Sequence, residues 1–403
     1  MKSFYGIVFL VVSLGFCELP WLRVGVGGSF ISQRYNILEE DTTALTSEGK
    51  FLLDGNYEKK YGSHTLRGEI STDIGDKSTW TQLVARWNFA SQLFKIEGSE
   101  IIEGRFSYHN DESIVGYGKH RFNLKLSQDF GARKISARLW VEGKRYENTS
   151  SYYYNYDLLR SKISYSFTFL GADGEAGWCY SYRSVPDSAD ANYDRRQIQM
   201  SLSKLWTGGN FGEVWFEYDR KHFPSETELG SYASMWTTSQ LSLSFPGVMV
   251  EPSIEIESRN YDVQDEVYFN YFWLKTTLAA GTDWGMWNFS AGPLFSMQSA
   301  AEEYAMENYT DWGAEISINC FNYNKFWLFL TVEPGKRFYQ SAPDTGISFS
   351  DYNFVDFSAV SSVWILKNIR ADLSASYFPE WHTTPEDDIS TSYISLSLRY
   401  EFY

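Results

Sequence analysis

Hydrophobic and polar residues alternate with a period of two along almost the whole chain after residue 18, as in the runs 135–141, 163–169 and 369–377. This period is the signature of a β-strand with one apolar face, and no segment shows the 3.6-residue stripe of an amphipathic helix. The runs are commonly ten to fourteen residues long, whereas strands of soluble sheets have about five or six. A tilted strand that crosses a bilayer needs about nine to eleven residues, so the pattern favours membrane-spanning strands.

The connections between these runs alternate in kind. Short turns rich in Gly, Asp and Asn, such as Tyr61–Ser63 and Phe245–Gly247, are separated by longer polar connections such as Asn36–Glu48 and Gln340–Asp351. Nine short turns and ten long connections predict twenty strands, with eighteen as the alternative, and place both termini on the short-turn side. An even number of antiparallel strands with this alternation is typical of a transmembrane up-and-down β-barrel with short periplasmic turns and longer extracellular loops.

A β-propeller is the main competing fold, because its blades also repeat about every 40 residues. A blade divides its repeat among four short strands, whereas this chain has two long strands in each repeat of about 38 residues. We therefore interpret residues 18–403 as a single all-β barrel domain.

Aromatic residues stand on the apolar side of the strands, immediately before the short turns. Amphipathic rings favour the level of the lipid headgroups, so this placement predicts an aromatic girdle on one side of a hydrocarbon band. The residues expected in the girdle are Phe89, Phe130, Phe169, Trp206, Phe245 and Phe402.

The last strand has a pattern of its own, in which apolar residues alternate with polar ones up to an aromatic end. The apolar positions are Ile394, Leu396, Leu398, Tyr400 and Phe402. This segment resembles the terminal assembly signal of bacterial outer-membrane β-barrel proteins of the porin-like superfamily, although Tyr403 follows the usual final Phe. The resemblance implies an outer-membrane location, with outer-membrane lipid and the barrel-insertion machinery as partners.

The first seventeen residues have the pattern of an export signal. Lys2 provides a positive start, and the apolar run from Tyr5 to Phe16 is too short to span a bilayer. Gly15 and Cys17 place small residues before a cleavage site at Glu18. Lipidation of Cys17 is the alternative, because Leu14 stands three residues before it as in a bacterial lipobox, although Phe16 directly before the cysteine departs from that motif.

The composition narrows the function classes. The chain has 35 Lys and Arg against 51 Asp and Glu, for a formal charge of −16, which argues against nucleic acid as a partner. The three cysteines lack ligand spacing, so we expect neither a metal site nor another cofactor. His109 and His382 are the candidates for acid–base chemistry in a loop, but no nucleophile motif accompanies them, and we do not expect an enzyme.

The polar side of the strands should line the lumen, and its charges fall into two groups. The expected sixth and seventh strands provide a basic wall, Arg121, Lys125, Lys134, Arg138 and Lys144. The expected eleventh and thirteenth provide an acidic wall, Glu213, Glu217, Asp219, Glu255 and Glu257. These charges either act on a solute or pair with residues on adjacent strands, and the sequence leaves both readings open.

The sequence therefore predicts a porin-like channel for passive diffusion of small hydrophilic solutes, with Lys134, Arg138, Glu217 and Glu255 setting selectivity. The alternative is a structural or adhesin-like barrel with a closed lumen. In that case a Tyr-rich loop would offer a binding surface, formed by Tyr152, Tyr153, Tyr154 and Tyr156.

Overall fold

The computed structural model describes most of the chain after residue 20. The described ranges are 21–37, 40–75, 78–91, 94–108, 115–148, 153–224, 230–265, 267–322, 325–340, 350–367, 369–383 and 387–402; side chains are described in these ranges apart from 21–54, 56, 75, 302, 303, 305 and 399–402. The predicted export signal and its cleavage site lie outside these residues.

Twenty β-strands make up nearly all of the described chain. They are β1 (Trp21–Ile37), β2 (Glu40–Tyr61), β3 (His64–Gly75), β4 (Ser78–Ala90), β5 (Phe94–Ser107), β6 (Tyr117–Asp129), β7 (Lys134–Tyr146), β8 (Tyr156–Phe169), β9 (Ala172–Ser184), β10 (Tyr193–Leu205), β11 (Phe211–His222), β12 (Tyr232–Phe245), β13 (Val248–Tyr261), β14 (Tyr271–Trp284), β15 (Trp287–Ala300), β16 (Tyr309–Asn322), β17 (Phe326–Tyr339), β18 (Tyr352–Leu366), β19 (Ile369–His382) and β20 (Ile389–Phe402). Two 3₁₀ segments, η2 (Ala189–Ala191) and η3 (Glu302–Glu307), lie in connections.

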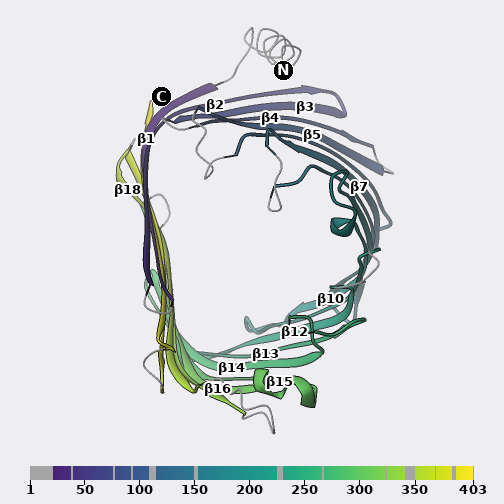
Figure 1. Ribbon diagram of the computed structural model, residues 1–403. Coiled ribbons are helices and arrows are strands. Elements are labelled where there is room, and N and C mark those ends of the chain that lie inside the picture. The colour runs from purple at the N-terminus through teal and green to yellow at the C-terminus, as the bar shows by residue number, and fades with distance from the viewer. Residues whose placement is uncertain are drawn as a thin grey trace.

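The strands form one antiparallel sheet in which each strand pairs with its neighbours in the chain. β1 also pairs with β20 over thirteen residues, from Val24 opposite Phe402 to Asn36 opposite Ser390. This pairing closes the sheet, and Figure 1 shows the first and last strands side by side in a ring. The predicted fold class is confirmed, and the strand number agrees with the larger of the two expected values.

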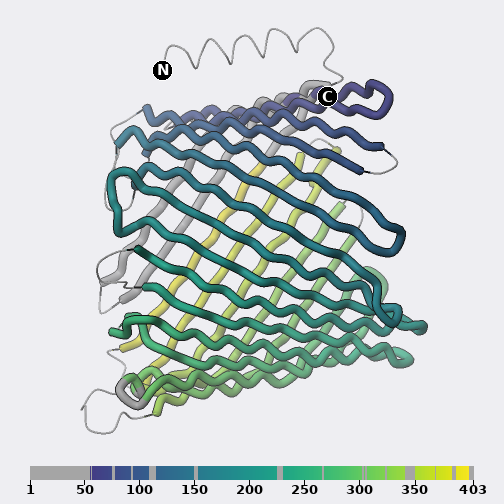
Figure 2. Tube along the Cα trace, turned by 90° about the vertical axis from the view of Figure 1, so that its right-hand side faces the viewer, coloured from purple at the N-terminus to yellow at the C-terminus, as the bar shows by residue number. Residues whose placement is uncertain are grey.

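Short and long connections lie at opposite ends of the barrel, as expected. The strands run between these ends at a steep tilt, and the near and far walls cross in projection (Figure 2). One expected long connection, Asn36–Glu48, is wrong: β1 continues to Ile37 and β2 begins at Glu40, with the two paired throughout. The segment 40–48 is rich in threonine, a β-branched residue that suits an extended hairpin.

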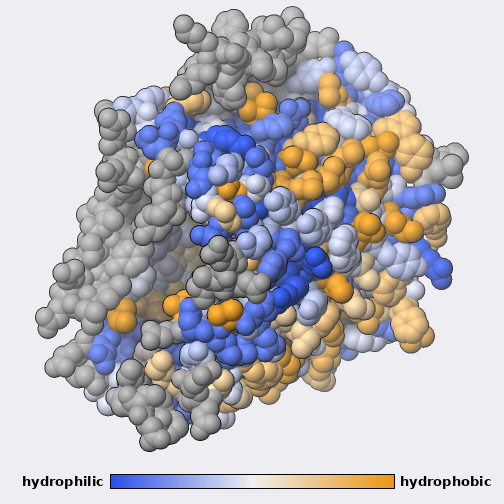
Figure 3. Space-filling model, turned by 45° about the vertical axis from the view of Figure 1, so that its right-hand side comes forward, coloured by the Kyte–Doolittle hydropathy of each residue, from blue (hydrophilic) through white to orange (hydrophobic). Residues whose placement is uncertain are grey.

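The outer face of the barrel is largely apolar. Leu126, Ile163, Leu278 and Leu396 are about half exposed on this face, and Figure 3 shows hydrophobic residues covering much of the right-hand part of the outer surface. Leaving such side chains in water would be unfavourable, so this face suits contact with hydrocarbon. Charged side chains also occur on this face; for example, Glu100 on β5 contacts His120 on β6 at 3.1 Å, and Asp194 contacts Arg196 on β10 at 3.6 Å.

The predicted girdle residues lie beside short turns, with large exposed fractions for Phe130, Phe169, Trp206 and Phe245. Phe89 is partly covered by the ring of His64, 4.7 Å away. The side chain of Phe402 lies outside the described residues, although its backbone ends β20. In the C-terminal strand, Ile394, Leu396 and Leu398 are exposed on the outer face, as their alternation predicts.

In the described part of the chain, no helix has the length and apolar character to cross a membrane. The same residues contain two free and buried cysteines, Cys179 and Cys320. They also hold no cluster of three or more His, Cys, Asp or Glu residues that could bind a metal ion.

Candidate functional site

Two recesses in the lumen wall contain most of the charged residues that the sequence singled out. The first, the basic cavity, has a volume of about 760 Å³ and extends from β2 to β7. Six basic and two acidic side chains line it: Lys60, Arg67, Arg86, Arg121, Lys125, Arg138, Glu58 and Glu97. It therefore includes three of the five residues of the predicted basic wall.

Several charges of the basic cavity are paired. The guanidinium of Arg121 lies 2.5 Å from the Glu142 carboxylate on β7, and the Lys125 ammonium lies 3.4 Å from Glu97 on β5. Arg86 and Arg67 both contact Glu69. The predicted basic wall is thus interleaved with carboxylates from adjacent strands, which is the second of the two readings left open by the sequence.

The second recess, the acidic cavity, has a volume of about 520 Å³ and extends from β10 to β16. Four acidic and two basic side chains line it: Glu217, Asp219, Glu255, Glu257, Arg195 and Arg259. Five aromatic side chains complete the lining: Tyr232, Trp236, Tyr271, Trp273 and Tyr309. It contains four of the five residues of the predicted acidic wall. β2–β7 and β10–β16 occupy different parts of the ring (Figure 1).

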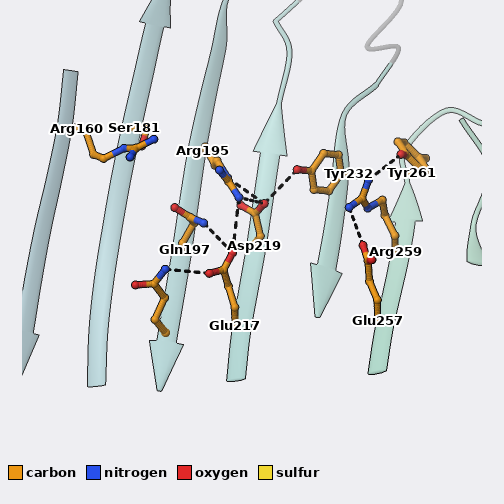
Figure 4. A network of polar contacts seen from close by, with 11 residues as sticks. Arg160, Ser181, Arg195, Gln197, Glu217, Asp219, Tyr232, Glu257, Arg259 and Tyr261 are labelled. Carbon is orange, nitrogen blue, oxygen red and sulfur yellow. Dashed lines mark hydrogen bonds and ion pairs between the residues drawn. The ribbon is translucent and has the colours of Figure 1, made fainter. Parts of the chain in front are cut away.

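A hydrogen-bonded network organises the acidic cavity (Figure 4). Asp219, with only 3% of its surface exposed, accepts two hydrogen bonds of 2.8–2.9 Å from Arg195 Nε and one of 3.1 Å from the Tyr232 hydroxyl. Arg259 donates to Glu257 at 2.6 Å. Paired charges of this kind offset the loss of hydration and hold the wall rigid.

One charge in each cavity has no ionic partner within 4 Å among the described residues. Glu255 accepts a hydrogen bond of 3.0 Å from Trp236 Nε1, and its neighbour across the strands, Lys275, instead contacts Glu333 at 3.0 Å. Arg138 donates to the Asn123 side chain at 2.8 Å, and its guanidinium lies 4.2 Å from the centre of the Trp140 ring. Both charges are held by neutral groups, so they remain available to a solute.

Three predicted wall residues lie outside the cavities. Lys134 contacts Asp129 at 3.6 Å beside a short turn, and Lys144 lies over the rings of Tyr117 and Tyr146. Glu213 is exposed on β11 near the short-turn end. All three residues have the lumen-facing parity that the sequence predicts, but they lie higher or lower along the barrel than the two cavities.

A belt of tyrosines, which was not predicted from the sequence, lies at the loop end of the lumen. Directly opposed pairs such as Tyr117 with Tyr146 and Tyr232 with Tyr261 place their rings 5.7–6.0 Å apart. The belt comprises Tyr117, Tyr146, Tyr156, Tyr193, Tyr232, Tyr261, Tyr271, Tyr309, Tyr339 and Tyr352. A spacing of 37 to 39 residues between its members at the starts of β6 to β16 is the signal that could have revealed it.

Hydrogen bonds and cation–π contacts connect the tyrosine belt to charged residues of the lumen. Tyr117, Tyr156 and Tyr271 each donate a hydrogen bond to a glutamate fourteen residues earlier, on the preceding strand, with oxygens 2.5–2.9 Å apart. Cations lie over the rings as well; the Arg337 guanidinium is 3.6 Å from the centre of the Tyr309 ring and also binds Asp311. These contacts fix the rings at the mouth of the lumen.

Acidic residues continue below the acidic cavity, also unnoticed in the sequence. Lys275 on β14 reaches Glu333 on β17 across two intervening strands. Asp356 lies directly opposite Glu333 on β18. The acidic side of the lumen therefore extends from β10 to β18.

One of the two histidines considered for acid–base chemistry, His382, is among the described residues. His109 lies outside the described residues. His382 ends β19, where its Nδ1 lies 2.8 Å from the Ser350 hydroxyl and its Nε2 lies 3.1 Å from Glu380. The Ser350 hydroxyl is also within 3.1 Å of Asp387, so this group joins the connections that precede β18 and β20.

Charge pairs also hold the connections at the loop end. Arg220 donates to Asp262, just after β13, at 2.6 Å, and this bond holds the pKa of the Asp262 carboxyl below its usual range. In η3, burial raises the pKa of Glu307.

Three residues of the Tyr-rich segment that the alternative function singles out contact neighbouring side chains. Tyr156 belongs to β8 and donates to Glu142, while Tyr153 packs against Tyr146 at 5.5 Å. Tyr154 lies near the Arg183 guanidinium, and Tyr152 is outside the described residues. Tyr156 is therefore the first residue of a strand and not part of the connection.

No protein-family model and no curated protein matches the chain. Solved structures do match. The outer membrane protein OpdK from Pseudomonas aeruginosa is 9% identical, with a TM-score of 0.50 over 96% of this chain and 100% of that one. A BenF-like porin from Pseudomonas fluorescens Pf-5 is 7% identical, with a TM-score of 0.51 over 95% and 100%. The alcaligin outer membrane receptor FauA from Bordetella pertussis is 10% identical, with a TM-score of 0.53 over 94% and 76%.

At these identities the likeness concerns the fold. The chain has the fold of bacterial outer-membrane β-barrel proteins, which confirms the resemblance drawn from its C-terminal strand. Together with the apolar outer face, this fold supports the expected location in the outer membrane.

Proposed function

We propose that the protein is an outer-membrane channel through which small hydrophilic solutes diffuse passively. The observation that carries this proposal is the lumen face itself, where two polar recesses with opposite excess charge lie on different parts of one closed wall. A wall divided in this way places a transverse field across the lumen, which favours polar and charged solutes over apolar ones.

Arg138 and Glu255 are the residues proposed to act on the solute, because each keeps its charge without an ionic partner. The paired residues around them hold the wall in shape. The OpdK and BenF-like structures share this fold, which is compatible with a channel and leaves the solute to be determined by the lumen of this chain.

Liposome swelling tests the proposal. Proteoliposomes loaded with a large impermeant polymer should swell when diluted into a solution of arabinose, because the sugar enters through the barrel and water follows. A longer sugar such as raffinose should enter more slowly. Swelling no faster than in protein-free liposomes would instead favour a closed, structural barrel.

The proposal also expects no catalysis at the loop end, where Ser350, His382 and Glu380 form a chain of hydrogen bonds. The nearby Asp387 carboxylate can accept the Ser350 hydroxyl proton in place of the imidazole, and an ionised acceptor is the stronger partner. We therefore expect a fluorophosphonate reagent to leave Ser350 unmodified, as read by intact mass. An adduct on Ser350 that disappears in the His382→Gln variant would show that the protein is an enzyme.

A further inference from the structure

We infer that the acidic cavity is a binding site for a small organic ammonium ion, with Glu255 and Trp236 as its centre. The inference deepens the proposed function, since it assigns a class of solute to one wall of the proposed channel. It rests on the charge balance of the cavity, its aromatic lining and its size.

The charge balance favours a cation. Arg195 is engaged by Asp219, and Arg259 is engaged by Glu257. The two other carboxylates of the cavity receive hydrogen bonds mainly from neutral donors. Glu217 accepts from the Gln197 and Gln199 side chains at 2.8 and 2.9 Å, with Arg195 more distant at 3.6 Å.

Glu255 is the most available of the four carboxylates. Among the described residues its single hydrogen bond comes from the indole of Trp236, and Lys275, directly across the strands, is held by Glu333. A carboxylate fixed by a neutral donor keeps its full charge and its remaining lone pairs for a ligand. A cation at this position would compensate the excess negative charge of the cavity.

The aromatic lining selects an organic cation. Trp236 is 40% exposed, and its ring is fixed by an edge-to-face contact with Trp215 at 4.9 Å. Trp273 and Tyr271 line the same recess. Ring faces attract ammonium groups, most strongly when the ring is a tryptophan. By contrast, the described residues contain no cluster suited to a metal ion.

The dimensions suit a small ligand. A volume of about 520 Å³ is within the range of about 300 to 1,000 Å³ typical of small-molecule sites. The cavity lies just below Tyr232, Tyr271 and Tyr309 of the tyrosine belt, which also line it. A solute that enters from the loop end would therefore reach Glu255 after passing the belt.

The test uses choline as the probe and isothermal titration calorimetry on the full protein in detergent micelles. The neutral comparison is the carbon isostere of choline, in which a quaternary carbon replaces the nitrogen. We expect choline to bind and the isostere to bind at least about tenfold more weakly, because carboxylate and ring-face attraction both require the charge.

Glu255→Gln should weaken choline binding about tenfold, since it removes the charge and keeps the shape and the acceptor for Trp236. Glu217→Gln provides a second variant with the same expected direction if Glu255→Gln does not fold. Glu213→Gln is the matched control, because it removes one negative charge from β11 outside the cavity, and it should bind choline as the wild type does.

The inference is overturned if choline and its isostere bind equally, if choline does not bind at all, or if Glu213→Gln weakens binding as much as Glu255→Gln. Binding in micelles does not require an open lumen. Choline binding without liposome swelling would therefore refute the channel and leave the site, whereas swelling without choline binding would refute the site alone.

Discussion

Replacing Asp219 by alanine is expected to destabilise the barrel by about 3 kcal/mol, the largest stability effect that we predict for a single lumen residue. Asp219 is buried and accepts hydrogen bonds from the Arg195 guanidinium and the Tyr232 hydroxyl. Its removal leaves Arg195 next to Glu217 alone, 3.6 Å away. A half-buried guanidinium without its main partner is costly because the lost hydration is no longer offset.

The measurement is urea-induced unfolding in micelles, followed by tryptophan fluorescence. Asp219→Asn should lose less, because the amide oxygen still accepts one hydrogen bond. Asp129→Ala is the surface control: its carboxylate is two-thirds exposed and contacts Lys134 at 3.6 Å, and such pairs contribute less than about 1 kcal/mol. Equal stabilities for Asp219→Ala and Asp129→Ala would show that the Arg195–Asp219 pair does not hold the wall.

The second large effect concerns ion selectivity. We expect the double variant Glu217→Gln/Glu255→Gln to pass cations relative to anions less readily than the wild type, by at least about fivefold. One unit charge about 4 Å from a permeating ion contributes about 1 kcal/mol in bulk water, which corresponds to about a factor of five in permeability. The two substitutions retain the shapes of the side chains, so the pore dimensions should change little.

The matched comparison is Arg121→Gln/Arg138→Gln in the basic cavity, which should shift selectivity in the opposite direction. Reversal potentials in planar bilayers under a gradient of potassium chloride measure both shifts. Raising the salt concentration should reduce them, because screening lengths shorten from about 10 Å at 0.1 M to about 3 Å at 1 M. Shifts of the same sign in both variants would contradict the assignment of the two walls.

The strand order of this barrel could be predicted from the chain because a period of two and an alternation of short and long connections are local signals. The apolar parity of Leu396 and Leu398 placed them on the outer face without any knowledge of their neighbours. Parity also assigned Glu217 and Arg138 correctly to the lumen.

The pairing of lumen charges could not be predicted, because it depends on register and curvature. Arg195 and Asp219 lie 24 positions apart and meet through the register of β10 and β11. Lys275 and Glu333 are 58 positions apart, and their contact crosses two strands. The same limit made the predicted walls look uniform in charge, whereas carboxylates such as Glu142 are interleaved with the basic residues.

Single-channel recording of the purified wild-type protein in a planar lipid bilayer is the most direct test of a water-filled, charge-divided lumen. An open barrel predicts discrete conductance steps whose size is proportional to voltage and rises with potassium chloride concentration. Stable insertion of the protein without any such steps would contradict the open channel and indicate a lumen closed by its own paired side chains.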